Sequence, residues 1–305
     1  MRGMIVAAGL GTRLQPLTDL RPKPALPVRG IPLISYAMAW LHQHGVSEVV
    51  INVHHLPAML EAVARTHCPA GMTLRFSHER ELLCTGGGIR RVADFLRESD
   101  PCLIIGGDML AQADLGALVA RHRTRGDAVT MLLREDPRIA SFGSVGVDAT
   151  GAVRRIATRH DLGGETRAGL YTWVNVVSRR ALDALPDREA FSHFQEWIAP
   201  LLPGGEIRGE IDLPCVWEPV GTLPEYLAAN MAPPGLGYID PDALAARTGT
   251  RLEAELVVGA GATLGAGASL RRVVVWDGEH VPDGLRASDG IFAGGVFHPV
   301  ETGPA

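Results

Sequence analysis

Short apolar runs alternate with helix-periodic segments along the first half of the chain. Near-continuous apolar runs predict buried strands at residues 4–8, 49–53, 73–76 and 102–105. Apolar positions at helical spacing predict helices over residues 34–44, 57–65 and 115–122. Because strands that are apolar along their whole length are buried on both faces, we expect an α/β fold in which helices cover a Rossmann-like, mostly parallel sheet.

The second half of the chain has a less regular pattern. Strands are predicted at residues 128–133 and 170–177, and the turn signal at 148–151 predicts a hairpin between them. The run Pro233-Pro234-Gly235 indicates a linker. These signals predict a main domain over residues 1–232, a linker over 233–253 and a separate tail over 254–305.

The tail carries its own repeat. Val258, Leu264 and Leu270 recur at intervals of six, and Val275 and Val281 resume that interval after a slip of one. This period is typical of a left-handed parallel β-helix, which would have two coils of roughly eighteen residues each. Since such a coil leaves sheet edges that usually meet a cap or a partner, the tail is a candidate surface for homo-oligomer formation.

Composition narrows the class of protein. A formal net charge of −5 and a pI near 6.1 argue against a nucleic-acid partner, because affinity for phosphate backbones comes from clustered cations. The four cysteines lack C-x-x-C spacing, which predicts reduced thiols rather than disulfides or a zinc site. The chain has neither a signal-peptide pattern nor an apolar run that could span a bilayer, so we expect a cytoplasmic protein without a membrane partner.

The first predicted strand leads into a glycine-containing loop, Gly9-Leu10-Gly11-Thr12-Arg13. Two glycines allow the backbone to turn sharply and to present its N–H groups to an anion. Arg13 follows the glycines, and Lys23, the only lysine in the chain, lies between two prolines. Because an ammonium is a compact charge that a guanidinium does not imitate, this exception among arginines suggests a function. The pattern predicts a site for a phosphate chain.

The segment that begins Ala7-Ala8-Gly9-Leu10-Gly11-Thr12-Arg13-Leu14 and continues through Pro22-Lys23-Pro24 resembles the signature of the sugar-1-phosphate nucleotidyltransferases. Rival phosphate loops fit less well. A dinucleotide-binding G-x-G-x-x-G would need a glycine at position 14, and the Gly-Lys-Ser/Thr of a Walker loop is absent from the chain.

The resemblance implies a reaction between a nucleoside triphosphate and a sugar 1-phosphate. The product would be a nucleoside-diphosphate sugar for cell-wall or surface-polysaccharide supply, with release of pyrophosphate. By resemblance, Arg13 and the backbone of Ala7, Ala8, Gly9, Gly11 and Thr12 would hold the triphosphate, and Lys23 would neutralise the reacting phosphates. Asp108 follows the fourth predicted strand, where a carboxylate points into the ligand crevice, and it matches the family's Mg²⁺ ligand.

A second stretch, from Ser77 to Ile89, contains three consecutive glycines before an amphipathic helical pattern. Such a backbone can pack flat against a planar ligand. By resemblance, Glu79, Thr85 and Gly86 would bind the nucleobase. A carboxylate accepts hydrogen bonds from uracil, thymine or guanine, so Glu79 is compatible with UTP, GTP and dTTP. By resemblance, UTP is favoured. The stretch is similar to that of N-acetylmuramic acid 1-phosphate uridylyltransferases, and the chain also resembles mannose-1-phosphate guanylyltransferase-like proteins.

Several positions depart from the family pattern. Pro219 stands where the family has its second Mg²⁺-binding aspartate, and Glu218 could replace it only through a bulge, because neighbouring strand side chains face opposite ways. The sugar-binding candidates are Asn175, Trp173, Arg159 and Thr222. These departures leave an alternative open, namely a regulatory protein that binds nucleotide sugars and is catalytically weak or inactive. The pair His54-His55 is better explained as loop structure than as a metal site.

Overall fold

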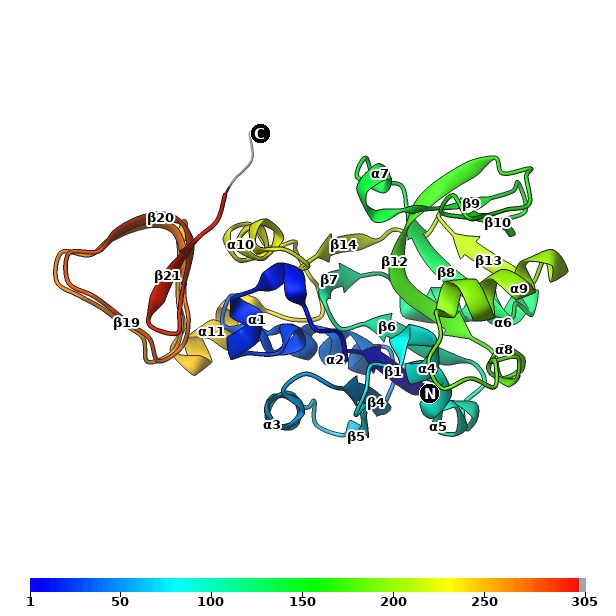
Figure 1. The fold of residues 1–305 in the computed structure, drawn as a ribbon, viewed down its shortest axis with the longest axis horizontal. Coiled ribbons are helices and arrows are strands. Elements are labelled where there is room, and N and C mark those ends of the chain that lie inside the picture. Colours follow the sequence, from blue (N-terminus) through cyan, green and yellow to red (C-terminus); the bar gives the residue numbers. More distant parts are fainter. Residues whose placement is uncertain (302–305) are drawn as a thin grey trace.

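The computed structural model describes residues 1–301 of the 305-residue chain, so the last four residues of the predicted tail lie outside the described part. A ten-stranded sheet forms the body of the protein, and a stack of short strands lies at one end (Figure 1). Half of the main sheet is parallel, as predicted. Its four adjacent strands, in spatial order, are β6 (Cys102–Gly106), β1 (Arg2–Val6), β4 (Glu48–Val53) and β5 (Thr73–His78).

The other half of the sheet is mixed. Its long central strand, β12 (Arg167–Val177), runs antiparallel to β6 and also pairs with β8 and β9. A short hairpin joins β9 to β10, whereas β13 follows a helical segment and pairs in parallel with β8. The remaining strands of this half are β8 (Val129–Arg134), β9 (Ser144–Val147), β10 (Val153–Ile156), β11 (His160–Asp161) and β13 (Ile207–Glu210).

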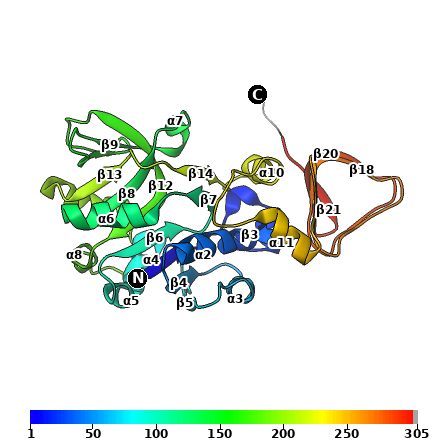
Figure 2. The ribbon, with the colours of Figure 1, turned by 180° about the vertical axis from the view of Figure 1, so that it is seen from behind.

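Helices cover both faces of the sheet, and each face has its own apolar core (Figures 1 and 2). One core is covered by α2 (Leu33–Gln43), α3 (Pro57–Thr66) and α6 (Leu115–Arg125). The opposite core is covered by α4 (Cys84–Arg91), α5 (Ala93–Arg97), α8 (Arg179–Asp183) and a π-helix (His193–Ile198) that continues into α9 (Ala199–Leu201). The predicted covered sheet is therefore confirmed.

One local prediction needs correction. The three glycines at 86–88 were expected to precede a helix, but they lie inside α4. Close packing explains them. A Cβ atom on Gly86 would collide with the Phe191 ring, and a Cβ atom on Gly88 would lie 2.8 Å from Glu79 Oε1. These glycines let α4 approach its neighbours rather than shape an open loop.

The C-terminal strands are β15 (Arg251–Glu253), β16 (Leu256–Val258), β17 (Thr263–Leu264), β18 (Ser269–Val275), β19 (His280–Val281), β20 (Arg286–Ala293) and β21 (Val296–Pro299). The inner strands, β16 to β20, stack in parallel at a constant spacing, and β15 and β21 pair antiparallel at the two edges. Leu256 pairs with Val273 and Thr263 pairs with His280, so successive layers are 17 residues apart. The apolar repeat shortens by one residue between Leu270 and Val275, which agrees with a coil of 17 residues rather than the predicted eighteen. Figure 1 shows these layers end-on as a triangular loop.

A third apolar core joins these strands to the main body. It contains Leu14 and Leu17 from the glycine-loop segment, Tyr226 from α10 (Leu223–Met231), and Trp276 from the tail. The segment between the two parts, residues 233–253, includes the helix α11 (Pro241–Thr248), which Figure 2 shows beside the tail. Smaller elements are α1 (Leu17–Leu20), β2 (Pro27–Val28), β3 (Ile31–Pro32), β7 (Met109–Gln112), α7 (Ile139–Phe142) and β14 (Val216–Pro219).

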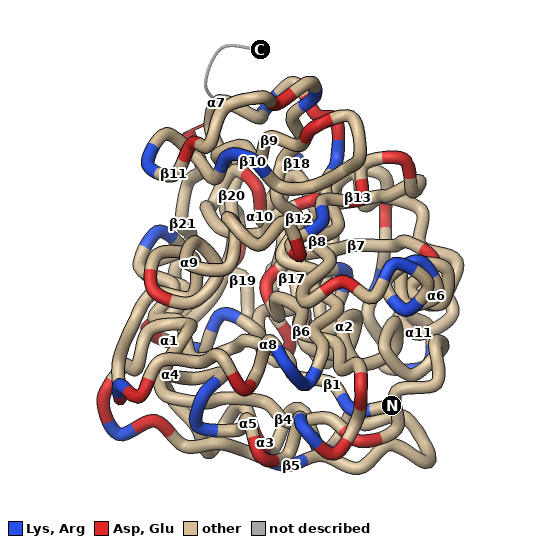
Figure 3. The backbone as a smooth tube through the Cα atoms, turned by 90° about the vertical axis from the view of Figure 1, so that its right-hand side faces the viewer, with Lys and Arg blue, Asp and Glu red and all other residues tan. Residues whose placement is uncertain are grey.

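Charged residues and cysteines are spread over the described chain. Basic and acidic positions are interspersed along the chain (Figure 3). All four cysteines are free thiols, and Cys84 is exposed. Within residues 1–301, no helix combines the length and apolarity that a membrane crossing requires.

Candidate active site

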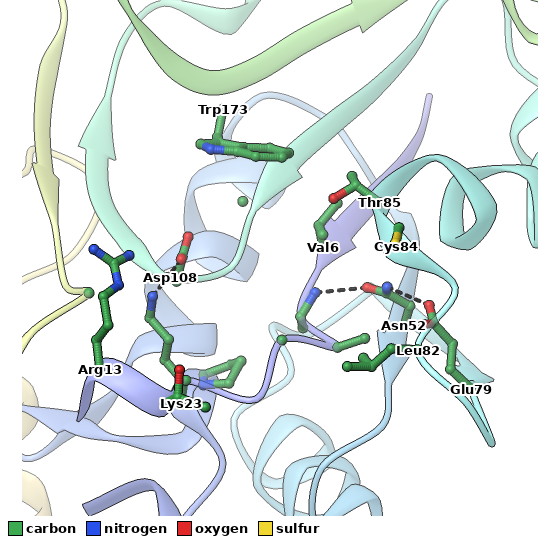
Figure 4. Close-up of a pocket in the computed structure, with 18 residues that line it drawn as sticks. Val6, Arg13, Lys23, Asn52, Glu79, Leu82, Cys84, Thr85, Asp108 and Trp173 are labelled. Atoms are coloured by element: carbon green, nitrogen blue, oxygen red, sulfur yellow. Dashed lines mark hydrogen bonds and ion pairs between the residues drawn. The ribbon is translucent and has the colours of Figure 1, made fainter. Parts of the chain in front are cut away.

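A cavity of about 320 Å³ opens where β1, β4 and β6 reach their carboxyl ends. Ligands of parallel α/β sheets bind at this edge, and the volume is in the range of small-molecule sites. Figure 4 shows its labelled side chains, which come from the glycine loop, from the strand ends and from the start of α4. Most of the residues that sequence patterns singled out lie here.

The glycine loop forms one wall of the cavity, to which Ala7, Ala8, Gly9, Gly11 and Thr12 all contribute. Gly11 has a φ of +67°, and a Cβ atom there would lie 2.8 Å from Thr18 Cγ2. A side chain at this position would therefore be strained and would also clash. The loop needs a glycine at this point to bring its backbone to the cavity.

Two cations and one carboxylate meet at the same end of the cavity. Lys23 Nζ lies 2.6 Å from Asp108 Oδ2, although the two residues are 85 positions apart. The Lys23 side chain is only 12% exposed, whereas that of Asp108 is 44% exposed. Arg13 also lines the cavity, and Figure 4 shows its guanidinium beside the Lys23–Asp108 pair. The structure thus brings together all three predicted catalytic residues.

Asn52 is a site residue that sequence reasoning missed. Its Oδ1 accepts a hydrogen bond from the Ala7 backbone N–H at 2.7 Å, and its Nδ2 donates to Glu79 Oε1 at 2.8 Å. Asn52 is 2% exposed, so it is a buried bridge between the glycine loop and Glu79. The available signal was an amide inside the otherwise apolar run Val49-Val50-Ile51-Asn52-Val53, because buried polar groups need partners.

Glu79 lies at the opposite end of the cavity from Lys23 (Figure 4). Its second oxygen, Oε2, accepts a hydrogen bond from the Leu83 N–H at 3.1 Å. Both oxygens therefore already have a protein donor, yet each can accept another hydrogen bond, since an ionised carboxylate has about four lone-pair sites.

The adjacent histidines support the cavity loops. His54 Nδ1 lies 2.8 Å from the carbonyl oxygen of Glu79, and His55 Nε2 lies 2.7 Å from that of Thr18. Each ring donates its N–H to a different loop, which agrees with the predicted structural role.

The start of α4 contributes Cys84 and Thr85 to the cavity wall. Cys84 adopts a φ of +56°, at the position where the resembled family often has glycine. Gly86, predicted to touch the nucleotide, is not among the lining residues described. Its N–H donates to the Phe191 carbonyl at 3.0 Å, so the structure places it behind the wall.

Trp173, a predicted sugar-binding residue, covers one end of the cavity. Its φ is +62°, and the register of β12 against β8 shifts between Tyr171 and Asn175. This bulge directs the indole over the cavity, above Asp108 in Figure 4. Asn175 does not reach the cavity; its Nδ2 donates to Tyr171 Oη at 2.7 Å.

Behind Trp173 lies a buried histidine, His193, whose ring centroid is 4.8 Å from that of the indole. Its Nε2 is buried without a hydrogen-bond partner among the described residues. Burial lowers the pKa of His193 to about 4, so the ring is neutral near pH 7. The indole therefore packs against a neutral aromatic ring.

Two further sugar-binding candidates lie outside the cavity wall. Arg159 is exposed in the turn between β10 and β11. Thr222 caps α10, where its side chain accepts a hydrogen bond from the Glu225 N–H. Its neighbour Gly221 does line the cavity, next to Arg13.

The structure does not bring Glu218 to the cavity. In β14, Glu218 pairs with Leu110 of β7, and its carboxylate lies 2.7 Å from Arg138 Nη1. Pro219 pairs with Met109, and the Val220 N–H donates to the Asp108 carbonyl, so Pro219 lies in the segment that runs next to Asp108. The Arg138 contact holds the Glu218 carboxylate, and Glu218 is not among the residues that line the cavity.

Metal-binding capacity at this end is consequently small. Within residues 1–301, no group of three or more His, Cys, Asp or Glu side chains is arranged to hold a metal ion. Mg²⁺, however, binds through one or two carboxylates together with substrate phosphates and waters. The half-exposed Asp108 fits one such ligand.

Fold and cavity together define an α/β protein with an anion-binding loop at the carboxyl edge of a parallel sheet. The sequence model described as nucleotidyl transferase matches residues 2–234, which is most of the chain. The protein belongs to this nucleotidyl transferase family, and the resemblance to sugar-1-phosphate nucleotidyltransferases is confirmed.

Individual relatives agree with this assignment. Mannose-1-phosphate guanylyltransferase of Mycobacterium tuberculosis is 32% identical over 299 residues, covering 92% of this chain and 81% of the relative. UTP–glucose-1-phosphate uridylyltransferase of Synechocystis is 26% identical, covering 75% and 62%. The crystal structure of HddC from Yersinia pseudotuberculosis complexed with GMP-PN has a TM-score of 0.63 at 21% identity, covering 75% of this chain and 97% of HddC, which shows a shared fold.

Proposed function

We propose that this protein is an enzyme that joins a nucleoside triphosphate to a sugar 1-phosphate, giving a nucleoside-diphosphate sugar and pyrophosphate. The observation that carries the proposal is the meeting of Arg13, Lys23 and Asp108 with the glycine loop in one cavity. A protein that only bound nucleotide sugars would have little need of two cations and a carboxylate at the same phosphate position. The names of the two relatives described above support the same reaction class.

Catalysis on this proposal is positioning and charge stabilisation. The glycine loop and Arg13 hold the triphosphate, and a sugar-phosphate oxygen attacks the α-phosphorus in line as pyrophosphate leaves. Lys23 exchanges its contact with Asp108 for the phosphate oxygens, where its charge opposes the negative charge that develops. The Lys23 side chain is mostly shielded from water, which strengthens this interaction.

Asp108 would hold Mg²⁺ together with the phosphates of the bound nucleotide. When bound, the metal neutralises phosphate charge and orients the reacting groups. Since Pro219 supplies no carboxylate near Asp108, Asp108 would be the one protein carboxylate that holds the metal, alongside nucleotide phosphates and water.

The base end of the cavity comprises Asn52, Glu79, Cys84 and Thr85. The buried Asn52–Glu79 bridge holds the carboxylate in one orientation, which suits a hydrogen bond to the N–H edge of a base. We propose UTP as the favoured substrate, with GTP and dTTP as alternatives, in the supply of cell-wall or surface polysaccharide. Trp173 narrows the sugar end and would limit which sugars enter.

The 17-residue stacking of the tail supports a further structural assignment. We propose that the coil is left-handed and that it offers an assembly surface to a second copy. Sedimentation of the purified protein at several concentrations tests the assembly.

One observation favours a second function. The proline near Asp108, at a position where the resembled family has an aspartate, would suit a regulatory protein that binds nucleotide sugars without turnover. Binding alone would still use the glycine loop and the Asn52–Glu79 bridge.

Pyrophosphate release separates the two functions. The assay combines Mg²⁺, each of ATP, CTP, GTP, UTP and dTTP, and a panel of hexose, N-acetylhexosamine, muramic and heptose 1-phosphates. Release with one pairing, lost in a Lys23→Met variant, supports the enzyme and names its substrates. If no combination releases pyrophosphate but calorimetry shows that the protein binds nucleotide sugars, the regulatory function is favoured.

A further inference from the structure

The C-terminal tail contacts the segment that carries Lys23 through two consecutive residues, Trp276 and Asp277. Arg21 donates from Nη1 to Asp277 Oδ1 at 2.7 Å and from Nη2 to Oδ2 at 3.0 Å. This bidentate ion pair joins residues that are 256 positions apart in the sequence. The same guanidinium lies 4.6 Å from the ring centroid of Trp276. Arg21 is therefore held both by charge and by stacking.

The other end of this segment is tied to the same place. The Trp276 Nε1–H donates to Tyr226 Oη at 2.9 Å, and the Tyr226 hydroxyl donates to the Pro27 carbonyl at 2.6 Å. Trp276 and Tyr226 are both buried. Lys23 thus lies between two anchored residues. Arg21 is bound by Asp277, and Pro27 is bound through Tyr226 to Trp276, the neighbouring tail residue.

The chain between the anchors is stiff. Pro22 and Pro24 flank Lys23, and Lys23–Ala25 form a 3₁₀ turn. Because each proline ring restricts its own φ and the preceding residue, a displacement of Arg21 is transmitted to Lys23 rather than absorbed. A third contact adds to this, since a Cβ atom on Gly294 of the tail would lie 2.9 Å from Leu20 Cδ1.

The Arg21–Asp277 pair adds little to global stability. The Asp277 side chain is 49% exposed and that of Arg21 is 26% exposed, and ion pairs near the surface contribute weakly to folding. Partial burial acts to raise the pKa of Asp277, yet the hydrogen bonds from Arg21 leave it below its ordinary value. A specific ion pair with little effect on stability, two residues from the catalytic lysine, fits a positioning role.

We infer that Asp277 of the tail is a positioning residue, which acts through Arg21 to keep the Lys23 ammonium directed at the reacting phosphates. The tail is then part of the active-site scaffold and more than an appended assembly element. This inference rests on the proposed function, because it assigns the orientation of Lys23 to catalysis.

Asp277→Asn removes the charge while keeping the shape of the side chain. We expect kcat to fall roughly 10-fold with the nucleotide KM changed less than twofold, because misplacement of a catalytic group lowers the rate without removing the binding groups. Asp277→Glu restores a carboxylate and should recover most of the rate. The matched control is Asp289→Asn, which breaks the 2.7 Å Arg272–Asp289 pair elsewhere in the tail and should leave kcat unchanged.

A second measurement reports on Lys23 without turnover. Lys23 is the only lysine, so reductive methylation with ¹³C-formaldehyde labels that side chain and the α-amino group alone. We expect the Lys23 methyl resonance to shift in Asp277→Asn and to stay in place in Asp289→Asn. Unchanged kcat and an unmoved resonance in Asp277→Asn would overturn the inference. If the wild-type protein releases no pyrophosphate while the resonance still shifts, the positioning stands and the proposed function fails.

Discussion

Replacing Lys23 by methionine separates catalysis from folding. Methionine keeps an unbranched apolar stem in the buried part of the site and removes only the ammonium. Asp108 loses its partner at 2.6 Å, but its side chain is 44% exposed and stays hydrated. The free energy of unfolding should therefore fall by about 1 kcal/mol or less, as for partly exposed ion pairs. For a chain of this size that corresponds to a melting temperature about 1–2 °C lower at most.

The effect on turnover should be much larger. Loss of one preorganised group that stabilises developing charge costs about 10²–10³ in kcat, equivalent to about 3–4 kcal/mol of transition-state stabilisation. Lys23→Arg should recover little of the rate, since a planar guanidinium does not reproduce a compact ammonium. Pyrophosphate release and thermal unfolding of the same samples provide both numbers.

The control for this experiment is Arg29→Met. Arg29 forms an ion pair with Asp242 at 2.9 Å, and its side chain is 15% exposed, close to the 12% of Lys23. Its loss should lower the melting temperature by a similarly small amount and leave kcat near the wild-type value. The assignment of Lys23 is refuted if Lys23→Met retains turnover within a few-fold, or if both variants lose activity equally.

Three further predictions concern the cavity. Glycine suits the φ of +62° at position 173, so Trp173→Gly should be about 1 kcal/mol more stable than Trp173→Ala in urea unfolding. Both variants should also accept larger sugar 1-phosphates as substrates. An unchanged substrate range would show that the Trp173 indole does not limit which sugars enter. Pro219→Asp adds a carboxylate near Asp108 and should lower the Mg²⁺ concentration for half-maximal rate roughly 10-fold. Mn²⁺ should also bind this variant more tightly, as measured by paramagnetic resonance. Equal Mn²⁺ affinity in the variant and the wild type would contradict the placement of position 219 near Asp108. Burial lowers the pKa of His193 from 6.5 to about 4, so the unfolded state binds more protons between these values, and stability is lost as pH falls through this window. His193→Leu should abolish about 3 kcal/mol of that loss in unfolding titrations from pH 7 to pH 4, and an unaltered pH profile would show that His193 is not the group.

The local pattern of apolar residues predicted much of the parallel half of the fold. Apolar runs predicted β1, β4 and β6, because a strand buried on both faces must be apolar throughout. The strand β5 was also predicted, although it lies at the sheet edge and is largely exposed. The second half was predicted less well. The strand β13 and the π-helix were missed, since short elements with mixed patterns depend on the neighbours they pack against.

The residues of the site also fall into two groups, those that the sequence singled out and those that it did not. The glycine loop, Lys23 and Asp108 could be singled out because each is an unusual residue at a strand end or in a rigid turn. Asn52 could not be assigned a role, since its partners Ala7 and Glu79 are 45 and 27 residues away. Only strand register brings these three together.

What the sequence by itself determined is therefore the set of elements and the anion-binding loop, which follow from periodicity and backbone restriction over a few residues. Tertiary structure alone decided three other features. Glu218 turns to Arg138, Gly86 packs on Phe191, and the tail holds Arg21 through Asp277. Each depends on which face of an element meets which neighbour, and that choice is made by the packing of the whole chain rather than by any local run of residues.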